Sequence, residues 1–286
     1  QFSLLSFLFE MFRSSDLPGR VYQSVIERER NLGYGGKCVE VVPHIPQEVI
    51  GRITRAAKKA KADVTIIEVG GTVGEYQNIL FLEAARLLKY QYPKDVISVL
   101  VSYLPVPVSI GEMKTKPTQT AVRMLNSTGV FADIIVARSP VGVDLKRKEK
   151  IARSCNVRVE NVISAPDVKS IYDIPVNYEE EKLSLRLCHL LGLPGKKPVD
   201  LTAWKNFIKR SKTNTTKVKI AVVGKYFSSG DFILSDVYIS VLEAIKYSAY
   251  SLNLQPEIHY LSAQDFTNKS SLAKLKKYDG VLIPGG

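Results

Sequence analysis

Short runs of apolar and β-branched residues alternate with helical segments along most of this chain, and that alternation limits the fold more than any other feature. Residues 63–67, 96–104 and 133–137 are typical of buried strands, and the segments between them carry apolar residues at helical spacing. Parallel strands need long crossover connections, which are usually helices. The sequence therefore predicts an α/β fold with a doubly wound, largely parallel sheet.

Residues 192–217 interrupt the pattern with proline, glycine and a lysine-rich run, which is typical of an interdomain linker with one short helix around Trp204. A second α/β unit begins at 219–226, and it is short for an independent domain, so we expect it to be incomplete. Further strands are expected at 38–42, 161–165, 257–261 and 280–283. Helices are expected at 21–30, 47–62, 78–92, 118–127, 144–153, 178–191, 236–252 and 272–276.

Three glycines lie within residues 66–75, between the predicted strand at 63–67 and the predicted helix at 78–92. In an open α/β sheet this position lies at the carboxyl edge, where ligands bind, and the first turn of the following helix suits anions. Glu68 would end the strand with its carboxylate facing that crevice, as a ligand for nucleotide-bound Mg²⁺. The alternative is an ordinary strand, turn and helix with a solvated glutamate.

A second candidate is the loop at residues 111–119, which leads into the predicted helix at 118–127. Two lysines, two threonines and a glutamine at the mouth of a helix can bind phosphate through charge, hydroxyl groups and the helix N-terminus together. The alternative is a capped helix with solvated lysines.

Forty Lys and Arg against 28 Asp and Glu give a net charge of +12, which favours polyanionic ligands such as nucleotides. A generally basic surface is the alternative. The three cysteines are widely spaced and odd in number, which argues against a disulfide scaffold and favours a reducing, cytoplasmic compartment. Residues 2–9 are apolar but too short to span a bilayer, and we interpret them as a cut edge or a non-native lead-in.

Seven motifs in a fixed order together resemble CTP synthase, and the resemblance runs from about Gly19 to Gly286. The motifs are Val-Tyr-Gln-Ser-Val-Ile-Glu-Arg-Glu-Arg at 21–30, Val-Val-Pro-His-Ile at 41–45, Ile-Glu-Val-Gly-Gly-Thr-Val-Gly at 67–74, Gly-Glu-Met-Lys-Thr-Lys-Pro-Thr-Gln at 111–119, Pro-Asp-Val-Lys-Ser-Ile-Tyr at 166–172, Val-Gly-Lys-Tyr at 223–226 and Ile-Pro-Gly-Gly at 283–286.

The resemblance implies a P-loop amidoligase-like domain at 19–191, after an unmatched lead-in at 1–18, and the start of a flavodoxin-like class I glutamine amidotransferase domain at 218–286. It implies ATP-dependent amination of UTP to CTP, the final step of CTP synthesis, with Mg²⁺ and with ammonia from glutamine. CTP is expected as feedback inhibitor. Family members are tetramers with active sites at subunit interfaces, and neither nucleic acid nor a membrane is expected as a partner.

The resemblance also assigns site residues. The contacts to UTP and CTP are Lys114, Thr115, Lys116, Pro117, Thr118, Gln119 and Lys150. Glu75, Tyr76 and Gln77 stand where family members usually carry an Asp-Ile-Glu tripeptide that contacts feedback-bound CTP. Pro166, Asp167 and Val168 match the segment beside the adenine of ATP, Glu68 matches a Mg²⁺ ligand, and Gly285 and Gly286 match the start of the glutamine-binding oxyanion segment.

Other family features are missing from this sequence. The Gly-rich P-loop that ends Gly-Lys-Gly and a second carboxylate ligand of Mg²⁺ do not occur, and the glutaminase Cys, His and Glu would lie beyond Gly286. Cys38, Cys155 and Cys188 do not lie in a Gly-x-Cys-x-Gly elbow and are interpreted as packing residues. We therefore expect no catalytic residue within this chain and no CTP formation by the chain alone.

Two other functions are compatible with parts of the sequence. A non-catalytic homologue would bind UTP or CTP and regulate or co-assemble with an intact enzyme. A nucleic-acid-binding protein would use the basic residues, but these lie at predicted ligand edges, on helix faces and in the linker, without interleaved aromatic residues.

Overall fold

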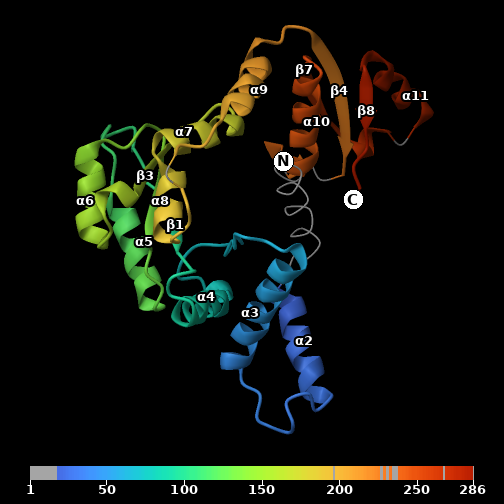
Figure 1. Cartoon of the computed structure of the whole chain (residues 1–286). Coiled ribbons are helices and arrows are strands. Elements are labelled where there is room, and N and C mark those ends of the chain that lie inside the picture. Colours follow the sequence, from blue (N-terminus) through green and yellow to red (C-terminus); the bar gives the residue numbers. More distant parts are fainter. Residues whose placement is uncertain are drawn as a thin grey trace. The chain divides into compact units, whose positions relative to one another are not determined.

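The computed structural model describes residues 18–195, 197–225, 228–229, 232–233, 238–266 and 268–285. They belong to two compact units, which meet in the sequence between Pro198 and Val199. Figure 1 shows helices and parallel strands in both units. The predicted α/β class with parallel sheets is therefore confirmed.

The sheet of the first unit contains three parallel strands in the order β1 (Val99–Tyr103), β2 (Ile134–Ser139) and β3 (Val162–Pro166). Helix α5 (Lys116–Ser127) connects β1 to β2, and helix α6 (Leu145–Cys155) connects β2 to β3. Each connection is a crossover helix, as the alternation in the sequence predicted. The strands and helices expected in this part of the chain are confirmed.

Helices cover both faces of this sheet. On one face Ile135 of β2 is fully buried in a cluster that includes Val122 of α5 and Ile151 of α6. On the other face Ile134 and Ile163 are fully buried beneath two further helices, α7 (Ile174–Glu180) and α8 (Leu183–Leu190). The sheet is therefore doubly wound over β2 and β3.

Strand β1 is less well covered than β2 and β3. Val99, Val101 and Tyr103 alternate along β1 on the face that α7 and α8 cover elsewhere, and all three side chains are exposed. Within the described residues β1 pairs with β2 alone. The strand therefore has an uncovered apolar face and an unpaired backbone edge.

Three helices precede the sheet, α2 (Pro18–Arg30), α3 (Val41–Ala60) and α4 (Ile79–Gln91). They share an apolar cluster of Val21, Val25, Ile45, Val49 and Ala84. Figure 1 shows α2 and α3 (blue) as neighbouring helices joined by a loop. The helices expected at 21–30, 47–62 and 78–92 are confirmed, with α3 starting earlier than expected.

A buried carboxylate ties α3 to α2. The side chain of Glu48 is 7% exposed, and its Oε1 accepts hydrogen bonds from Arg52 Nε at 2.9 Å and Arg55 Nη2 at 3.3 Å. Arg52 also donates to Ser24 Oγ and to the carbonyl oxygen of Arg20, both on α2. Since a buried charge needs such partners, Glu48 and Arg52 act together as the polar centre of this helix pair.

The strand expected at 38–42 is wrong. Residues 37–40 are irregular, and α3 begins at Val41. Val41 and Val42 are exposed, so the apolar run does not contribute to a core. Pro43 directly follows the run and has no N–H to extend a strand ladder, which favours the helix start that the structure adopts.

The strand expected at 63–67 is also wrong. These residues are irregular, and Val64, Ile66 and Ile67 are exposed. A strand is stable only beside a hydrogen-bonded neighbour, and no described strand pairs with this segment. Its apolar composition is typical of a buried strand, but a neighbouring strand that would bury it is absent from the described residues.

The single helix expected at 178–191 is two helices, α7 and α8. The chain turns at Lys182, whose φ of 60° is left-handed and ends a helix. Beside the turn, Glu181 accepts a hydrogen bond from Ser164 N at 3.0 Å and forms an ion pair with Lys148. These contacts with β3 and α6 come from the tertiary fold, so the helical spacing of apolar residues did not reveal them.

The second unit has a parallel sheet in the order β7 (Gln255–Ser262), β4 (Lys217–Gly224) and β8 (Gly280–Leu282). Helix α10 (Ile239–Ser251) packs on it through Leu242, which contacts Val222 and Tyr238 in the core cluster. The strands and the long helix expected here are confirmed. The remaining elements are α11 (Lys269–Leu272), the short strands β5 (Ser228–Ser229) and β6 (Phe232–Ile233), and 3₁₀ turns in the two units at Tyr76–Asn78, Val159–Asn161, Ile171–Asp173, Ala263–Phe266 and Ala273–Lys277.

The helix expected around Trp204 is α9 (Thr202–Thr213). Its Phe207 is buried, and the ring centroid of Phe207 lies 4.9 Å from that of Tyr247 on α10. The helix therefore packs within the second unit instead of lying in a free linker. None of the described helices has the length and apolar character needed to cross a bilayer.

Cys155 is buried in the first unit, whereas Cys38 is exposed. Burial raises the pKa of the Cys155 thiol, so less of the reactive thiolate forms at a given pH. We expect iodoacetamide at pH 8 to label Cys38 at least about tenfold faster than Cys155 in the native protein, and at similar rates in denaturant. Mass spectrometry of tryptic peptides measures both rates, and equal native rates would contradict the burial of Cys155.

Candidate functional site

The carboxyl edge of the β1–β2–β3 sheet holds most of the residues that the sequence singled out. Residues 104–115 follow β1, residues 140–144 follow β2 and residues 167–170 follow β3. Because parallel strands end at the same edge, the three loops and the first turns of α5 and α6 meet there. This edge is the candidate site.

The first turn of α5 contains residues of two kinds. Thr115, Thr118 and Gln119 are buried, and Thr118 is 0% exposed. The hydroxyl groups of Thr118 and Ser102 share a hydrogen bond of 2.9 Å, which joins α5 to β1. Gln119 Nε2 donates to Thr115 Oγ1 at 3.2 Å. Thr118 therefore holds the helix against the sheet, and Gln119 ties the first turn to the residue that precedes α5.

The other residues of this segment are accessible. Lys116 and Pro117 are exposed, and Lys114 is partly exposed. Lys114 Nζ donates to Glu112 Oε2 at 2.6 Å. That hydrogen bond and the Lys114 charge lower the pKa of Glu112, and the charges of Arg147 and Lys150 lower it further.

The lowered pKa of Glu112 depends on two of the predicted site residues, Lys114 and Lys150. Lys150 is exposed on α6, and its charge makes the smallest contribution to the lowered pKa of Glu112, the carboxylate that Lys114 binds. The two lysines are far apart in the sequence, since Lys114 lies in the loop before α5 and Lys150 lies on α6. Glu112 therefore lies within electrostatic range of both Lys114 and Lys150, which the family resemblance assigned to the pyrimidine nucleotide.

Arg147 belongs to the same group but was not among the predicted site residues. Helix α6 starts at an N-cap, Asp144, whose Oδ1 accepts a hydrogen bond from Arg147 N at 2.8 Å. The Arg147 guanidinium also pairs with the Asp144 carboxylate. The hydrogen bond from the backbone of Arg147 is the main reason that the pKa of Asp144 is lowered. In the sequence, Arg147 lies three residues before Lys150, and this spacing places both side chains on one face of the helix.

The glycine-rich loop at 70–74 packs against α5. Gly74 has a φ of +98°, and a Cβ atom there would lie 2.1 Å from Met124 Cε. Asn78 is buried at the other end of the loop, and its Nδ2 donates to Thr72 O at 2.9 Å and to Gly70 O. Glycine at position 74 therefore permits both the turn and its close approach to the helix.

The tripeptide Glu75, Tyr76 and Gln77 follows this loop. Gln77 Nε2 donates to Glu75 Oε2 at 2.6 Å, and this bond, with help from Thr72, lowers the pKa of Glu75. Tyr76 is 93% exposed. Two of the three side chains therefore bind each other, and the third projects outward.

Glu68 lies on the irregular segment before the loop, with an exposed side chain. No group of three His, Cys, Asp or Glu side chains suited to a metal ion occurs among the described residues. A Mg²⁺ ion usually binds one or two carboxylates and completes its shell with water and phosphate oxygens. A single accessible carboxylate fits such an ion when a nucleotide brings the remaining ligands.

A cavity of about 560 Å³ opens at the ends of β2 and β3. Its wall contains Pro166, Asp167 and Val168, which the sequence predicted, and residues that it did not. The additional lining residues are Arg138, Ala165, Ile171, Ile174, Asn177 and Tyr178. The volume lies in the range of small-ligand pockets, and most of the lining is apolar.

Arg138 is the last but one residue of β2, and its Nη2 donates to Asp167 Oδ1 at 3.0 Å. The backbone N–H of Asp167 also donates to Ser139 O at 2.9 Å, which continues the strand contact beyond β3. Sequence reasoning named Asp167 without its partner. Arg138 could have been found from the sequence, because it is a charged residue at the carboxyl end of a predicted buried strand.

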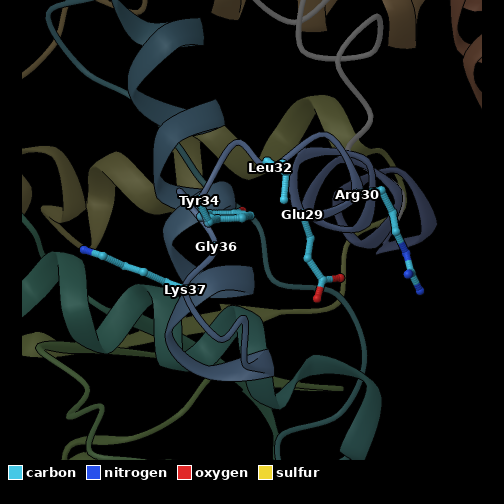
Figure 2. Close-up of a pocket in the computed structure, with 6 residues that line it drawn as sticks. All are labelled: Glu29, Arg30, Leu32, Tyr34, Gly36 and Lys37. Atoms are coloured by element: carbon cyan, nitrogen blue, oxygen red, sulfur yellow. The ribbon is translucent and has the colours of Figure 1, made fainter.

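Another hollow, of about 310 Å³, lies where α2 meets the loop before α3. It is lined by Glu29, Arg30, Leu32, Tyr34, Gly36 and Lys37. Figure 2 shows that Arg30 and Lys37 extend in opposite directions, away from Tyr34. Charged groups that do not converge offer no common binding point, so we assign no site to this hollow.

In the second unit, Gly285 follows the end of β8 at the carboxyl edge of the sheet. A Cβ atom at Gly285 would meet no atom within 4 Å, so the space beside its backbone is open. Gly286 lies outside the described residues. The two glycines predicted to contact glutamine can therefore be placed only in part.

A family model described as "CTP synthase N-terminus" matches residues 10–193, starting inside the segment expected to be an unmatched lead-in. CTP synthase from Microcystis aeruginosa is 40% identical over 290 aligned residues, which covers 97% of this chain and 51% of the relative. CTP synthase from Methanothermobacter thermautotrophicus is 38% identical and covered to 52%. The chain spans about half the length of these curated relatives.

Proposed function

This chain belongs to the CTP synthase family, and from that premise we propose that it is part of a ligase that converts UTP into CTP. The reaction uses ATP and takes its amido nitrogen from glutamine. The observation that carries the proposal is the ion pair of Lys114 with Glu112 at the carboxyl edge of the sheet, where the charges of Arg147 and Lys150 on α6 act on the same carboxylate. A cation from the loop before α5 and another from α6 fit a triphosphate better than a capped helix with solvated lysines does.

The chemistry explains why such a site is strongly cationic. The 4-oxygen of the uracil ring is a poor leaving group, and transfer of the terminal phosphoryl group of ATP to it creates a better one. Ammonia then adds at carbon 4, and inorganic phosphate leaves with the oxygen. Two triphosphates must lie close together for the first step, so positive side chains are needed to offset their charge.

We assign the UTP triphosphate to Lys114, Lys116 and Lys150, with Arg147 beside them. Thr115, Thr118 and Gln119 position the site, because Thr118 fastens the first turn of α5 to β1 and Gln119 bonds to Thr115 at the start of that turn. The backbone N–H groups of that turn then face the edge, where they favour an anion. The same residues are the proposed contacts of CTP when it acts as feedback inhibitor.

We assign the ATP adenine to the cavity beside Pro166, Asp167 and Val168, whose apolar wall suits the faces of a base. Glu68 would hold a Mg²⁺ ion together with phosphate oxygens, and the ion would offset part of the phosphate charge. Glu75, Tyr76 and Gln77 would contact feedback-bound CTP. The exposed Tyr76 ring is the side chain of this tripeptide that is free to reach a ligand.

The second unit is proposed to be the start of a glutamine amidotransferase domain. A parallel sheet with open space beside Gly285 suits a segment whose backbone N–H groups approach the glutamine amide. The assembled protein is proposed to be a cytoplasmic tetramer, as the family resemblance implies. In such a protein, the ammonia released by this second domain reaches the UTP site.

Titration of the purified chain with UTP tests the proposal. Glu112 holds Lys114 in an ion pair and places a negative charge beside the proposed triphosphate, so Glu112→Gln is expected to tighten UTP binding by about two- to tenfold. Because the pKa of Glu112 is lowered, its carboxylate remains ionised as pH falls toward 5, and the gain should persist throughout pH 5–8. Calorimetry measures both dissociation constants.

The control variant is Glu29→Gln, an exposed glutamate on α2, which should leave UTP affinity unchanged. A chain that is folded by circular dichroism yet binds no UTP would remove the basis for the proposal. Weaker binding by the Glu112 variant would show that Glu112 supports the site and does not compete for Lys114.

A further inference from the structure

The cavity at the ends of β2 and β3 contains a polar side chain that its neighbours leave without a partner. Arg138 and Asp167 pair with each other on the cavity wall. Tyr178 packs its ring against the apolar cluster beneath α7. The carboxamide of Asn177 makes no hydrogen bond with any described residue, although its backbone oxygen accepts one from Glu181 N.

The surroundings of Asn177 favour a role for its carboxamide in ligand binding. It is half-buried on α7, one turn after Ile174 and beside Tyr178, and all three residues line the cavity. A half-buried amide loses hydrogen bonds to water, and this cost is recovered when a ligand supplies a donor and an acceptor. The carboxamide presents one of each, side by side.

We propose that Asn177 recognises the edge of the adenine base and so selects ATP over other purine nucleotides. The inference rests on the proposed placement of ATP in this cavity. Asn177 accepts a hydrogen bond from the 6-amino group and donates one to a neighbouring ring nitrogen, as asparagine does when it reads adenine in DNA. Guanine carries a carbonyl oxygen at position 6 and presents two acceptors along that edge, so it leaves one half of the carboxamide unmatched.

The apolar part of the wall complements this contact. Pro166, Val168 and Ile171 offer surfaces for the flat faces of a base, but such surfaces accept any purine. Selectivity must come from a group that senses the pattern of donors and acceptors. On this wall, within the described residues, Asn177 is the amide side chain that remains available for that role.

The experiment compares adenosine with purine riboside, which differs by lacking the 6-amino group. Both nucleosides are titrated at millimolar concentrations into the full chain, and NMR signals of the Ile171 and Ile174 methyl groups report binding in the cavity. The wild-type chain should prefer adenosine by at least about fivefold. Asn177→Ala should bind both nucleosides about equally, because it loses the contact with the ring nitrogen for both and the contact with the 6-amino group for adenosine alone.

A matched control is Glu180→Ala, an exposed residue on the same helix that does not line the cavity and should keep the full preference. If Asn177→Ala retains the preference while both methyl signals still respond, the role of Asn177 is overturned and the adenine cavity stands. If neither nucleoside nor ATP shifts the two methyl signals, the placement of ATP fails as well. Alanine favours a helix, so a loss of fold at position 177 is not expected, and circular dichroism verifies this.

Discussion

Replacing Lys114 and Lys150 together with alanine is expected to weaken UTP binding by about 30-fold or more. Each lysine would lose a charge-assisted hydrogen bond to phosphate, and each contribution is reduced because both side chains reach solvent. The single variants should each lose about five- to tenfold if the lysines act on the same triphosphate. Calorimetry at low and at moderate salt measures the dissociation constants.

The matched control is Lys58→Ala, which removes one positive charge from the exposed last turn of α3. It should change UTP affinity less than twofold, since no candidate residue lies on α3. An equal loss in the control and the Lys114 variant would mean that UTP senses only the net charge of the chain. Unchanged affinity in the folded double variant would contradict the proposed triphosphate site.

Replacing Glu48 with alanine is expected to destabilise the pairing of α2 and α3 by about 2–4 kcal/mol. The carboxylate is buried and accepts hydrogen bonds from Arg55 and from Arg52, which is only 17% exposed, so its removal breaks charge-assisted bonds in a largely buried place. Hydrogen exchange of the amides in α2 should accelerate roughly 30- to 1000-fold if that helix opens locally. Glu48→Gln keeps the shape and one acceptor, so its effect should be intermediate.

Glu29→Ala serves as the control, because Glu29 is an exposed glutamate on α2. Its effect should stay within about 0.5 kcal/mol. Similar exchange rates in the Glu48 and Glu29 variants would show that the buried carboxylate contributes little and that the apolar cluster alone holds the helices. Exchange in β2 should not change in either variant, since that strand belongs to a separate cluster.

The fold was predictable from sequence wherever a pattern is local. The strands β1, β2 and β3 and their crossover helices follow from apolar runs and helical spacing, and Asp144 marks the start of α6 as an N-cap. The prediction failed at 63–67, where a strand-like run has no neighbour among the described strands. It also failed at Lys182, where contacts made by Glu181 end a helix. In both cases the deciding interaction is distant in sequence.

The candidate site was predictable by type of residue and only partly by geometry. The loop before α5 suggested phosphate binding, yet three of the polar residues in this segment are buried, and one of them, Thr118, fastens the helix to the sheet. The proximity of Lys150 to this loop depends on how α5 and α6 lie on the sheet, and the sequence does not contain that information. Arg138 and Asn177 were missed because the cavity joins a strand end to a later helix.

The unpaired edge of β1 affects how this polypeptide behaves in concentrated solution. Its backbone N–H and C=O groups on that side are free within the described residues, and Val99, Val101 and Tyr103 add an apolar surface. Natural sheets shield such edges, because an open one is a template onto which a foreign strand can add. Resistance of this polypeptide to aggregation therefore depends on whether another segment pairs with β1, however well packed the interior is.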